Sequence, residues 1–272
     1  MIKQIIDTHA HIDQLADIQG ALQRAKQAGV SDIVAVSVDL NSMGKILDLA
    51  KSVQEPNPST SLRVSPECNR RTKIHPALGI HPGMVKEGEP AEAFDFIRSH
   101  IKEAVAIGET GLDYWYKWVR DNTEERAKQK DALAKHLQLA KEFHLPIIIH
   151  SRGAWRDCLS MAQEAGVAKA LFHWYSGPVD IMKGILDSGF YVSTSPSVAY
   201  SPQSQQAMLA ANVERILIET DSPVSYKDDH GGFTSEPKDV WRTLQALSRL
   251  KNIDEEKLLD MVNHNAREFF GL

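Results

Sequence analysis

Eight short apolar segments, each rich in β-forming residues, constrain the fold of this chain more than any other feature. They occupy residues 4–8, 32–38, 74–80, 103–108, 146–149, 168–172, 190–193 and 215–218. Each is apolar throughout, without the alternation of a strand that faces water on one side. This pattern is typical of parallel strands that are covered on both faces.

Patterns with helical spacing separate these segments. We expect helices over 15–28, 41–53, 91–101, 123–143, 152–165, 178–187, 202–210 and 237–250, and one or two more over 253–270. Eight strands alternating with eight helices predict an α/β fold, a (β/α)8 TIM barrel with an extra C-terminal helix. A doubly wound open sheet alternates in the same way. However, no G-x-G-x-x-G follows the first strand, so its dinucleotide-binding form has little support. The sequence contains no obvious linker, and we predict a single domain over residues 1–272.

The balance of charges and the cysteines limit the class of protein. Asp and Glu number 36 against 31 Lys and Arg, a formal net charge of -5, which argues against a protein that coats nucleic acid by bulk electrostatics. Cys68 and Cys158 are far apart in sequence and predict a reducing compartment. We expect no signal peptide from the first ten residues, and no apolar run approaches about 18 residues. We therefore expect a cytoplasmic protein that does not associate with membranes.

Six of the eight predicted strands end in a side chain that can bind a metal ion. The first strand runs into Asp-Thr-His-Ala-His at 7–11, and five others end at His81, Glu109, His150, His173 and Asp221. With 11 His and 36 Asp and Glu among 272 residues, chance would place such a side chain at one or two ends. The strand ends of a barrel meet at one mouth, where barrel enzymes have their active sites.

These residues have the chemistry of a centre with two metal ions. The expected ligands are His9, His11, Glu109, His150, His173 and Asp221. His9 and His11 lie on the same side of an extended chain, and the two oxygens of Glu109 can bridge two ions. Four imidazoles and two carboxylates without a thiolate suit Zn²⁺, Mn²⁺, Co²⁺ or Mg²⁺. Two ions about 3.5–4 Å apart with a bridging hydroxide would be a hydrolytic arrangement.

Several roles are open for two neighbouring residues. His81 could ligate a metal, contact a phosphate or pack in its Gly-Ile-His-Pro-Gly turn. Asp7 could orient a ligand histidine from behind or be a buried structural acid. The other six histidines fit no cluster, and we expect them to be structural or surface residues.

Seven stretches of the chain together resemble the TatD family of metal-dependent deoxyribonucleases, within the wider group of amidohydrolase-type barrels. They are DTHAHID at 7–13, ALGIHPG at 77–83, AIGETGLDYW at 106–115, PIIIHSRGA at 146–154, FHWYSG at 172–177, ILIETDSP at 216–223 and NHNAREFF at 263–270. They follow the order of the family and span nearly the whole chain. Glu109 stands where the related phosphotriesterase-like barrels carry a carbamylated lysine, which favours the TatD family.

The resemblance implies a role for each ligand. One divalent ion would be held by His9, His11 and Asp221 and the other by His150 and His173, with Glu109 bridging. Asp221 would also accept the proton of the attacking water, so Asp221 and Glu109 are the expected catalytic residues. The implied reaction is hydrolysis of phosphodiester bonds that removes nucleotides from a DNA end, with single-stranded or frayed ends as substrate. We expect no obligate protein partner.

Further side chains are candidate substrate contacts. Trp115 and Lys117 lie in TGLDYWYKWVR at 110–120, where aromatic and cationic side chains could stack on bases and hold phosphate, or simply fold over the barrel rim. Arg152 and Tyr175 each follow a ligand histidine by two residues and are, like His81, candidates for a phosphate contact. Asn265 is more simply explained as an anchor of the last helix.

Departures from the family pattern bear on the substrate. Trp174 and Tyr175 stand where the family often has Cys-Phe, and the insertion at 55–71 is longer than usual. Many relatives carry a basic stretch where this chain has Asp228 and Asp229. The acidic pair disfavours DNA, whereas the aromatic and cationic loop at 110–120 favours it. The alternative function is therefore a small-molecule or aminoacyl-ester or amide hydrolase that uses the same two ions.

Overall fold

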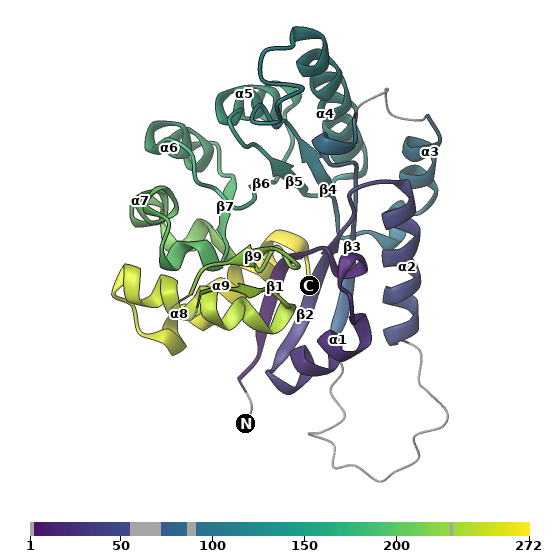
Figure 1. Ribbon diagram of the computed structural model, residues 1–272. Helices are drawn as coiled ribbons and strands as arrows, with labels where there is room; N and C mark the ends of the chain where they lie inside the picture. The colour runs from purple at the N-terminus through teal and green to yellow at the C-terminus, as the bar shows by residue number, and fades with distance from the viewer. Residues whose placement is uncertain (1–2, 55–71, 86–90, 229–230) are drawn as a thin grey trace.

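Eight parallel strands, paired in chain order, form the wall of a nearly closed barrel in the computed structural model, which describes residues 3–54, 72–85, 91–228 and 231–272. The strands are β1 (Ile5–Ala10), β2 (Val30–Val36), β3 (Lys73–Leu78), β4 (Ala106–Gly111), β5 (Ile147–His150), β6 (Ala170–Phe172), β7 (Tyr191–Thr194) and β8 (Ile216–Ile218). Helices lie around the strands on the outside (Figure 1). The predicted TIM barrel with an additional C-terminal helix is confirmed.

The helices between and after the strands follow the predicted order. They are α1 (Ile18–Gln27), α2 (Leu40–Gln54), α3 (Ala91–Ser99), α4 (Thr123–Phe143), α5 (Trp155–Ala165), α6 (Val179–Asp187), α7 (Pro202–Ala210), α8 (Val240–Lys251) and α9 (Glu255–Phe270). The longest, α4, begins at Thr123 because the Asn122 side chain accepts hydrogen bonds from the backbone N–H groups of the first turn. Among the described helices, none combines the length and apolar character needed to cross a membrane.

Some predicted boundaries are wrong. The helix expected over 91–101 ends at Ser99, and Ile101–Glu103 forms a separate 3-10 turn, so β4 starts at Ala106 rather than at 103. The helix expected from 152 starts at Trp155, because a turn precedes it in which the Ala154 N–H donates to the Ser151 carbonyl. Part of the loop after β8 is also paired, as the short antiparallel strands β9 (Ser225–Tyr226) and β10 (Phe233–Thr234).

Two apolar cores lie on the two faces of the strands. Ile6 and Val34 belong to the inner core, which Phe269 and Phe270 of α9 also join, whereas the neighbouring Ile5 belongs to the outer core beneath the helices. Successive strand residues thus point into different cores, which explains why the strands are apolar throughout. The Lys169 ammonium, just before β6, donates to carbonyls at the end of α9, so this helix covers the end of the barrel where the strands begin.

Side-chain and loop hydrogen bonds join β8 to β1 where the barrel closes. The Asp7 carboxylate accepts hydrogen bonds from the Thr220 hydroxyl (2.6 Å) and N–H (3.0 Å), and the Asp221 N–H donates to the His9 carbonyl (2.9 Å). Asp7 is fully buried, and within the described structure it has no contact with a histidine ring, only with the His9 N–H (3.4 Å). Of its two possible roles, the structure supports the buried structural acid.

The terminal helix is tied to the barrel by two asparagines. The Asn263 side chain accepts from the Ile6 N–H and donates to the Gln4 carbonyl. The Asn265 amide donates to the carbonyls of Val213 and Ile216. These bonds confirm the expected anchoring role of Asn265.

Irregularities in β1 and β4 occur where candidate ligands lie. The pairing register shifts between Asp7 and Ala10 and again between Ile107 and Thr110, as it does at a β-bulge. Strands β3 and β4 also approach closely, since a Cβ on Gly79 would lie 2.6 Å from the Gly108 Cα. A bulge redirects the side chains around it, and here it directs His9 and Glu109 toward the mouth of the barrel.

Candidate metal centre at the barrel mouth

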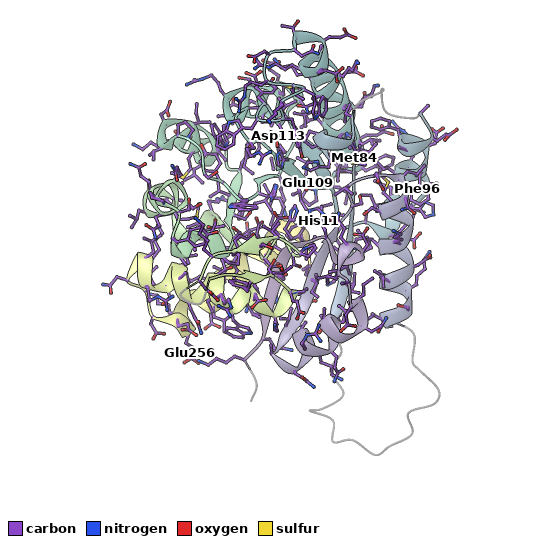
Figure 2. All side chains as sticks on the ribbon, viewed as in Figure 1. His11, Met84, Phe96, Glu109, Asp113 and Glu256 are labelled. Atoms are coloured by element: carbon purple, nitrogen blue, oxygen red, sulfur yellow. The ribbon has the colours of Figure 1, made fainter. Side chains whose placement is uncertain are left out.

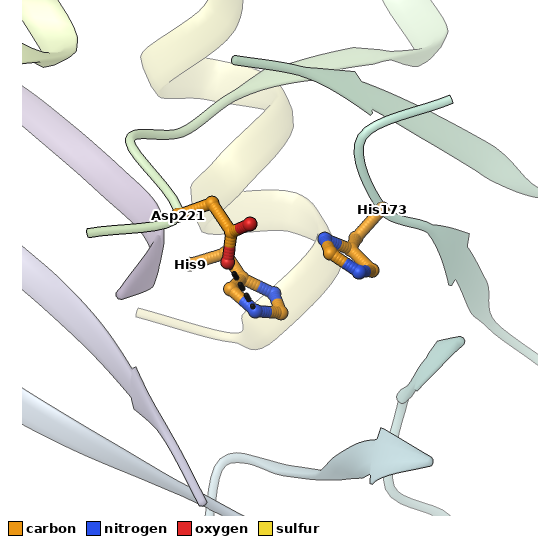
Figure 3. Close-up of side chains that lie close together, drawn as sticks. All are labelled: His9, His173 and Asp221. Carbon is orange, nitrogen blue, oxygen red and sulfur yellow. Dashed lines mark ion pairs between the residues drawn. The ribbon is translucent and has the colours of Figure 1, made fainter. Parts of the chain in front are cut away.

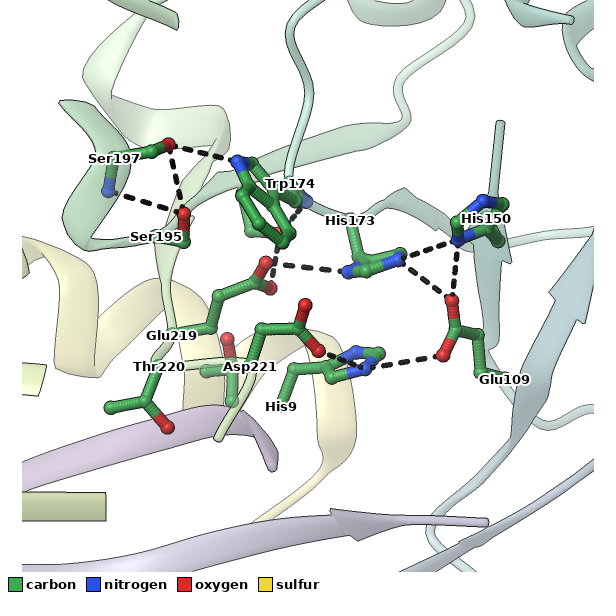
Figure 4. A network of polar contacts seen from close by, with 12 residues as sticks. His9, Glu109, His150, His173, Trp174, Ser195, Ser197, Glu219, Thr220 and Asp221 are labelled. Atoms are coloured by element: carbon green, nitrogen blue, oxygen red, sulfur yellow. Dashed lines mark hydrogen bonds and ion pairs between the residues drawn. The ribbon is translucent and has the colours of Figure 1, made fainter. Parts of the chain in front are cut away.

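The Glu109 carboxylate lies between two pairs of histidines. Its Oε1 is 2.8 Å from both His150 Nδ1 and His173 Nε2, and its Oε2 is 3.4 Å from both His9 Nε2 and His11 Nε2. The carboxylate is buried, with 1% of the residue exposed. Figure 4 shows it reaching His9 on one side and His150 and His173 on the other. One carboxylate therefore presents a different oxygen to each pair.

The first donor set consists of His9, His11, Glu109 and Asp221. Asp221 Oδ1 is 3.4 Å from His9 Nε2 and 3.3 Å from His11 Nε2, and the two Nε2 atoms are 3.3 Å apart. A tetrahedral zinc site with bonds of about 2.0–2.1 Å has donor atoms roughly 3.4 Å apart. Asp221 Oδ1 is also buried without a hydrogen-bond donor. An oxygen that is buried in this way and faces two ring nitrogens fits a cation.

The second donor set consists of His150, His173 and the other oxygen of Glu109. His150 Nδ1 and His173 Nε2 are 3.3 Å apart. The His173 ring also stacks on His9, with 4.1 Å between ring centroids, so the two sets are adjacent (Figure 3). The structure thus brings all six predicted ligands together, in two sets that share Glu109.

His81 lies beside this centre in a different role. Its Nε2 is 3.8 Å from Glu109 Oε1, and its Nδ1 accepts the Gly83 N–H at 2.9 Å. Burial lowers the pKa of His81 to about 3, so the ring is neutral. With Nδ1 accepting, the single proton is on Nε2, which then faces the centre as a hydrogen-bond donor. This geometry favours an anion contact over metal ligation.

The second nitrogen of three ligand rings has a partner behind the centre. His11 Nδ1 contacts the Val36 carbonyl (2.8 Å), His173 Nδ1 the Glu219 carboxylate (3.3 Å) and His150 Nε2 the Asp113 carboxylate (2.9 Å). Such contacts fix ring orientation and tautomer, so that the other nitrogen is free for a metal. Sequence reasoning did not identify Asp113 or Glu219. The signal was present, because both are acids within four residues of a predicted ligand.

Asp113 connects several parts of the mouth (Figure 2). Its Oδ2 also accepts from Arg152 Nε (2.9 Å), and its Oδ1 accepts the Trp115 N–H (2.9 Å). The Asp113 N–H donates to the Gln129 side chain of α4, whose amide donates to the Pro82 carbonyl. The loops after β3, β4 and β5 are therefore held in one hydrogen-bonded network around a fully buried carboxylate.

The carboxylates Glu109 and Asp221 are ionised, and protons in the centre are held by the imidazoles around them. Burial opposes ionisation of Glu109, but the surrounding histidines outweigh it and hold its pKa well below the usual range. The pKa of Asp221 is lowered in the same way. Burial likewise opposes protonation of His11, yet the nearby carboxylates of Asp221 and Glu109 raise its pKa to about 10. A divalent ion that binds here would displace such protons.

The predicted substrate contacts have different environments. Arg152 lies at the rim, with 45% of its side chain exposed, and Trp115 and Lys117 are exposed on the loop after β4. Tyr175, by contrast, is not at the exposed rim. The residue is fully buried, and its hydroxyl donates to the Pro178 carbonyl (2.7 Å).

Only some of the positions at which the sequence departs from the family pattern lie within the described residues. Asp228 is 3.7 Å from Arg242, so the positive charge of the guanidinium offsets its negative charge. Asp229 and the insertion at 55–71, including Cys68, lie outside the described residues. Cys158 is buried in α5.

Comparison with known proteins identifies a consistent set of relatives. A family model described as TatD related DNase matches residues 6–271. Human deoxyribonuclease TATDN3 is 28% identical over 98% of this chain and 94% of its own length, and the metal-dependent hydrolase TatD of Mycobacterium tuberculosis is 29% identical over 98% of each. The crystal structure of YJJV, a TatD homologue of Escherichia coli, has the same fold, with a TM-score of 0.86 and 23% identity over 100% of both chains.

Proposed function

Because the chain belongs to the TatD family of metal-dependent hydrolases, which act on ester bonds, we propose that it is a deoxyribonuclease that removes nucleotides from DNA ends. The observation that carries the proposal is the division of the Glu109 oxygens between two histidine pairs. The ligands are also buried, with 0% of His9 and 1% of Glu109 exposed. A strand end can approach ligands buried to this degree more readily than the middle of a duplex can, which supports an exonuclease.

The chain offers donors for two divalent ions. We assign one to His9, His11 and Asp221 and the other to His150 and His173, with Glu109 shared by both. Nitrogen and oxygen donors of this kind suit zinc, manganese, magnesium or cobalt. When bound, such ions would supply a hydroxide nucleophile at neutral pH and offset the negative charge that develops on the phosphate.

Three side chains would act on the substrate directly. The ionised Asp221 carboxylate would accept the proton of the attacking water. The His81 Nε2–H and the exposed end of Arg152 would donate to phosphate oxygens and hold the phosphodiester against the centre.

Asp221 has the backbone dihedral φ 49°, a conformation that non-glycine residues rarely adopt. Its N–H bond to the His9 carbonyl helps to hold the aspartate in this conformation.

The first test is degradation of DNA. End-labelled single-stranded oligonucleotides should be shortened stepwise in the presence of Mg²⁺, Mn²⁺, Zn²⁺ or Co²⁺, and a chelator should stop the reaction. Frayed duplex ends should be degraded more slowly, and closed circular single strands should persist. Cleavage of the circles would contradict the exonuclease. Failure to shorten any DNA with any of these ions would favour the small-molecule ester or amide hydrolase.

A second test removes the shared carboxylate. Glu109→Ala should abolish metal-dependent hydrolysis, a loss of at least about 1000-fold, since neither ion would keep its complete donor set. The barrel should still give a folded circular dichroism spectrum. Leu209→Ala, which truncates an exposed side chain of α7, is the matched control and should retain activity. Substantial activity in Glu109→Ala would contradict the shared role.

A further inference from the structure

Three of the four exposed large apolar side chains of the described residues lie on loops at the mouth of the barrel. The four are Met84, Trp115, Tyr200 and Leu209, which are 51%, 56%, 40% and 57% exposed. The first three follow β3, β4 and β7 at their carboxyl ends, where the candidate metal centre lies, whereas Leu209 is in α7. Exposed aromatic surface of this kind is a common mark of a binding site.

Trp115 is packed on one side despite its exposure. Its backbone N–H donates to Asp113 Oδ1, which fixes the main chain that carries the indole, and the ring itself lies edge-to-face with Trp155 at 6.5 Å between centroids. The indole also lies over Gly153, where an added Cβ would be only 2.5 Å from the Trp115 Cδ1 atom. Gly153 has φ +74°, which also favours glycine. A ring fixed in this way loses little conformational entropy when a ligand binds.

A cation lies next to this ring and connects it to the centre. The Arg152 guanidinium carbon is 5.7 Å from the Trp115 ring centroid and 5.4 Å from that of Tyr116. Asp113 Oδ2 holds Arg152 Nε and His150 Nε2 together, each at 2.9 Å. One carboxylate thus bonds the backbone of Trp115, a cation at the rim and a candidate metal ligand.

From this arrangement we infer that Trp115 is a stacking platform for an unpaired nucleobase of the DNA strand whose phosphodiester lies at the metal centre. The inference rests on the proposed function and deepens it. An aromatic ring can stack on any base, so the platform gives little sequence preference. Inside a duplex both faces of a base are already stacked on its neighbours. The platform therefore favours single-stranded or frayed ends, with Arg152 binding the phosphate beside the stacked base.

Two other aromatic residues of this loop have a different role. Tyr116 and Trp118 stack on each other with 5.7 Å between centroids, and both are partly buried. The Tyr116 ring also lies edge-to-face with His81 at 6.4 Å. These two side chains cover the barrel rim, which leaves Trp115 as the exposed ring of the loop.

The test removes the base and the indole separately. One substrate is a single-stranded oligothymidylate, and the other has the same backbone with abasic residues at both ends. The wild-type protein should cleave the intact strand with a kcat/KM about 5- to 150-fold higher than the abasic strand, the range expected for one stacked base. Trp115→Ala should cleave both strands at the wild-type rate for the abasic strand. Trp115→Phe, which keeps a ring, should retain most of the preference.

Each outcome can be distinguished from a failure of the proposed function. Leu209→Ala removes an equally exposed apolar side chain from α7 and should behave as wild type. If Trp115→Ala keeps the full preference for the intact strand, the platform is wrong while the nuclease stands. If the wild-type protein cleaves neither strand with any of the four metals, both proposals are overturned.

Discussion

Single hydrogen bonds determine which ring nitrogen three of the four ligand histidines, His11, His150 and His173, present to the candidate metal centre. His150 is the exception among the ligands, because it presents Nδ1 to Glu109 whereas the others present Nε2. The Asp113 carboxylate explains the difference, since it holds His150 Nε2 at 2.9 Å on the opposite side of the ring. A buried acid that touches no substrate therefore positions a ligand, and it belongs to a residue that the sequence alone did not single out.

Removing the charge of Asp113 should weaken metal binding without unfolding the barrel. We predict that Asp113→Asn lowers affinity for the ion at His150 by about 10- to 100-fold, because a neutral amide polarises the imidazole less. Isothermal titration calorimetry with Zn²⁺ or Mn²⁺ measures this directly. Asp32→Asn is the matched control, since Asp32 contacts His75 at 2.8 Å near the start of its strand, away from the mouth. Equal affinities in wild type and Asp113→Asn would exclude the positioning role.

At the scale of elements, helix α4 supports the strand end that carries His81. His136 of α4 is fully buried, accepts the Ile80 N–H through Nε2 (3.2 Å) and contacts the Ala132 carbonyl through Nδ1 (2.8 Å). Burial lowers its pKa from the ordinary 6.5 to about 4. Protonation would remove the acceptor for the Ile80 N–H. A histidine predicted to be structural therefore helps to place a residue of the proposed site.

The depressed pKa of His136 predicts a defined loss of stability in acid. Between pH 6.5 and 4 the unfolded chain binds this proton and the folded chain does not, so the free energy of unfolding falls as the pH falls through that window. His136 should account for about 3 kcal/mol of the fall. Denaturant unfolding at several pH values, with a chelator present, should show a flatter dependence in His136→Gln than in wild type. Parallel curves would contradict this assignment.

At the scale of the whole molecule, the distribution of charge decides what the barrel can attract. The chain carries a formal net charge of -5, yet two divalent ions at the mouth would outweigh the carboxylates of Glu109 and Asp221 by about two positive charges. An anionic strand would then be drawn to one point of an otherwise negative surface. The net negative charge argues against a protein that coats DNA. A positive charge confined to the mouth is compatible with a protein that engages a DNA end.

Metal binding should also stabilise the whole barrel, because the ligands come from strands all around it. An ion present at 100 times its dissociation constant adds about 2.7 kcal/mol to the free energy of unfolding. For a chain of this size we expect a rise in Tm of roughly 5–10 °C. Differential scanning calorimetry with and without chelator measures the shift, which should be much smaller in Glu109→Ala. A Tm independent of metal in the wild-type protein would contradict the proposed centre.

The sequence by itself determined the order and type of the elements and the six candidate metal ligands at the mouth. Apolar runs and helical spacing are local properties, and in a parallel barrel every strand end faces the same way, so His9, Glu109 and Asp221 could be expected to meet. The family was also recognisable from short motifs, and the family model confirms it. Boundaries such as the start of β4 were wrong because a short 3-10 turn has no strong sequence pattern.

Only the tertiary structure decided which atoms face one another. The Asp7 bond to Thr220 that helps to close the barrel and the Asp113 bond to His150 join residues 213 and 37 positions apart. Tyr175 is buried in the apolar core, and its hydroxyl bonds the Pro178 carbonyl. Spacing along a chain gives the face on which a side chain lies. The partner of each polar atom depends on packing between distant segments, and for that physical reason local patterns could not supply it.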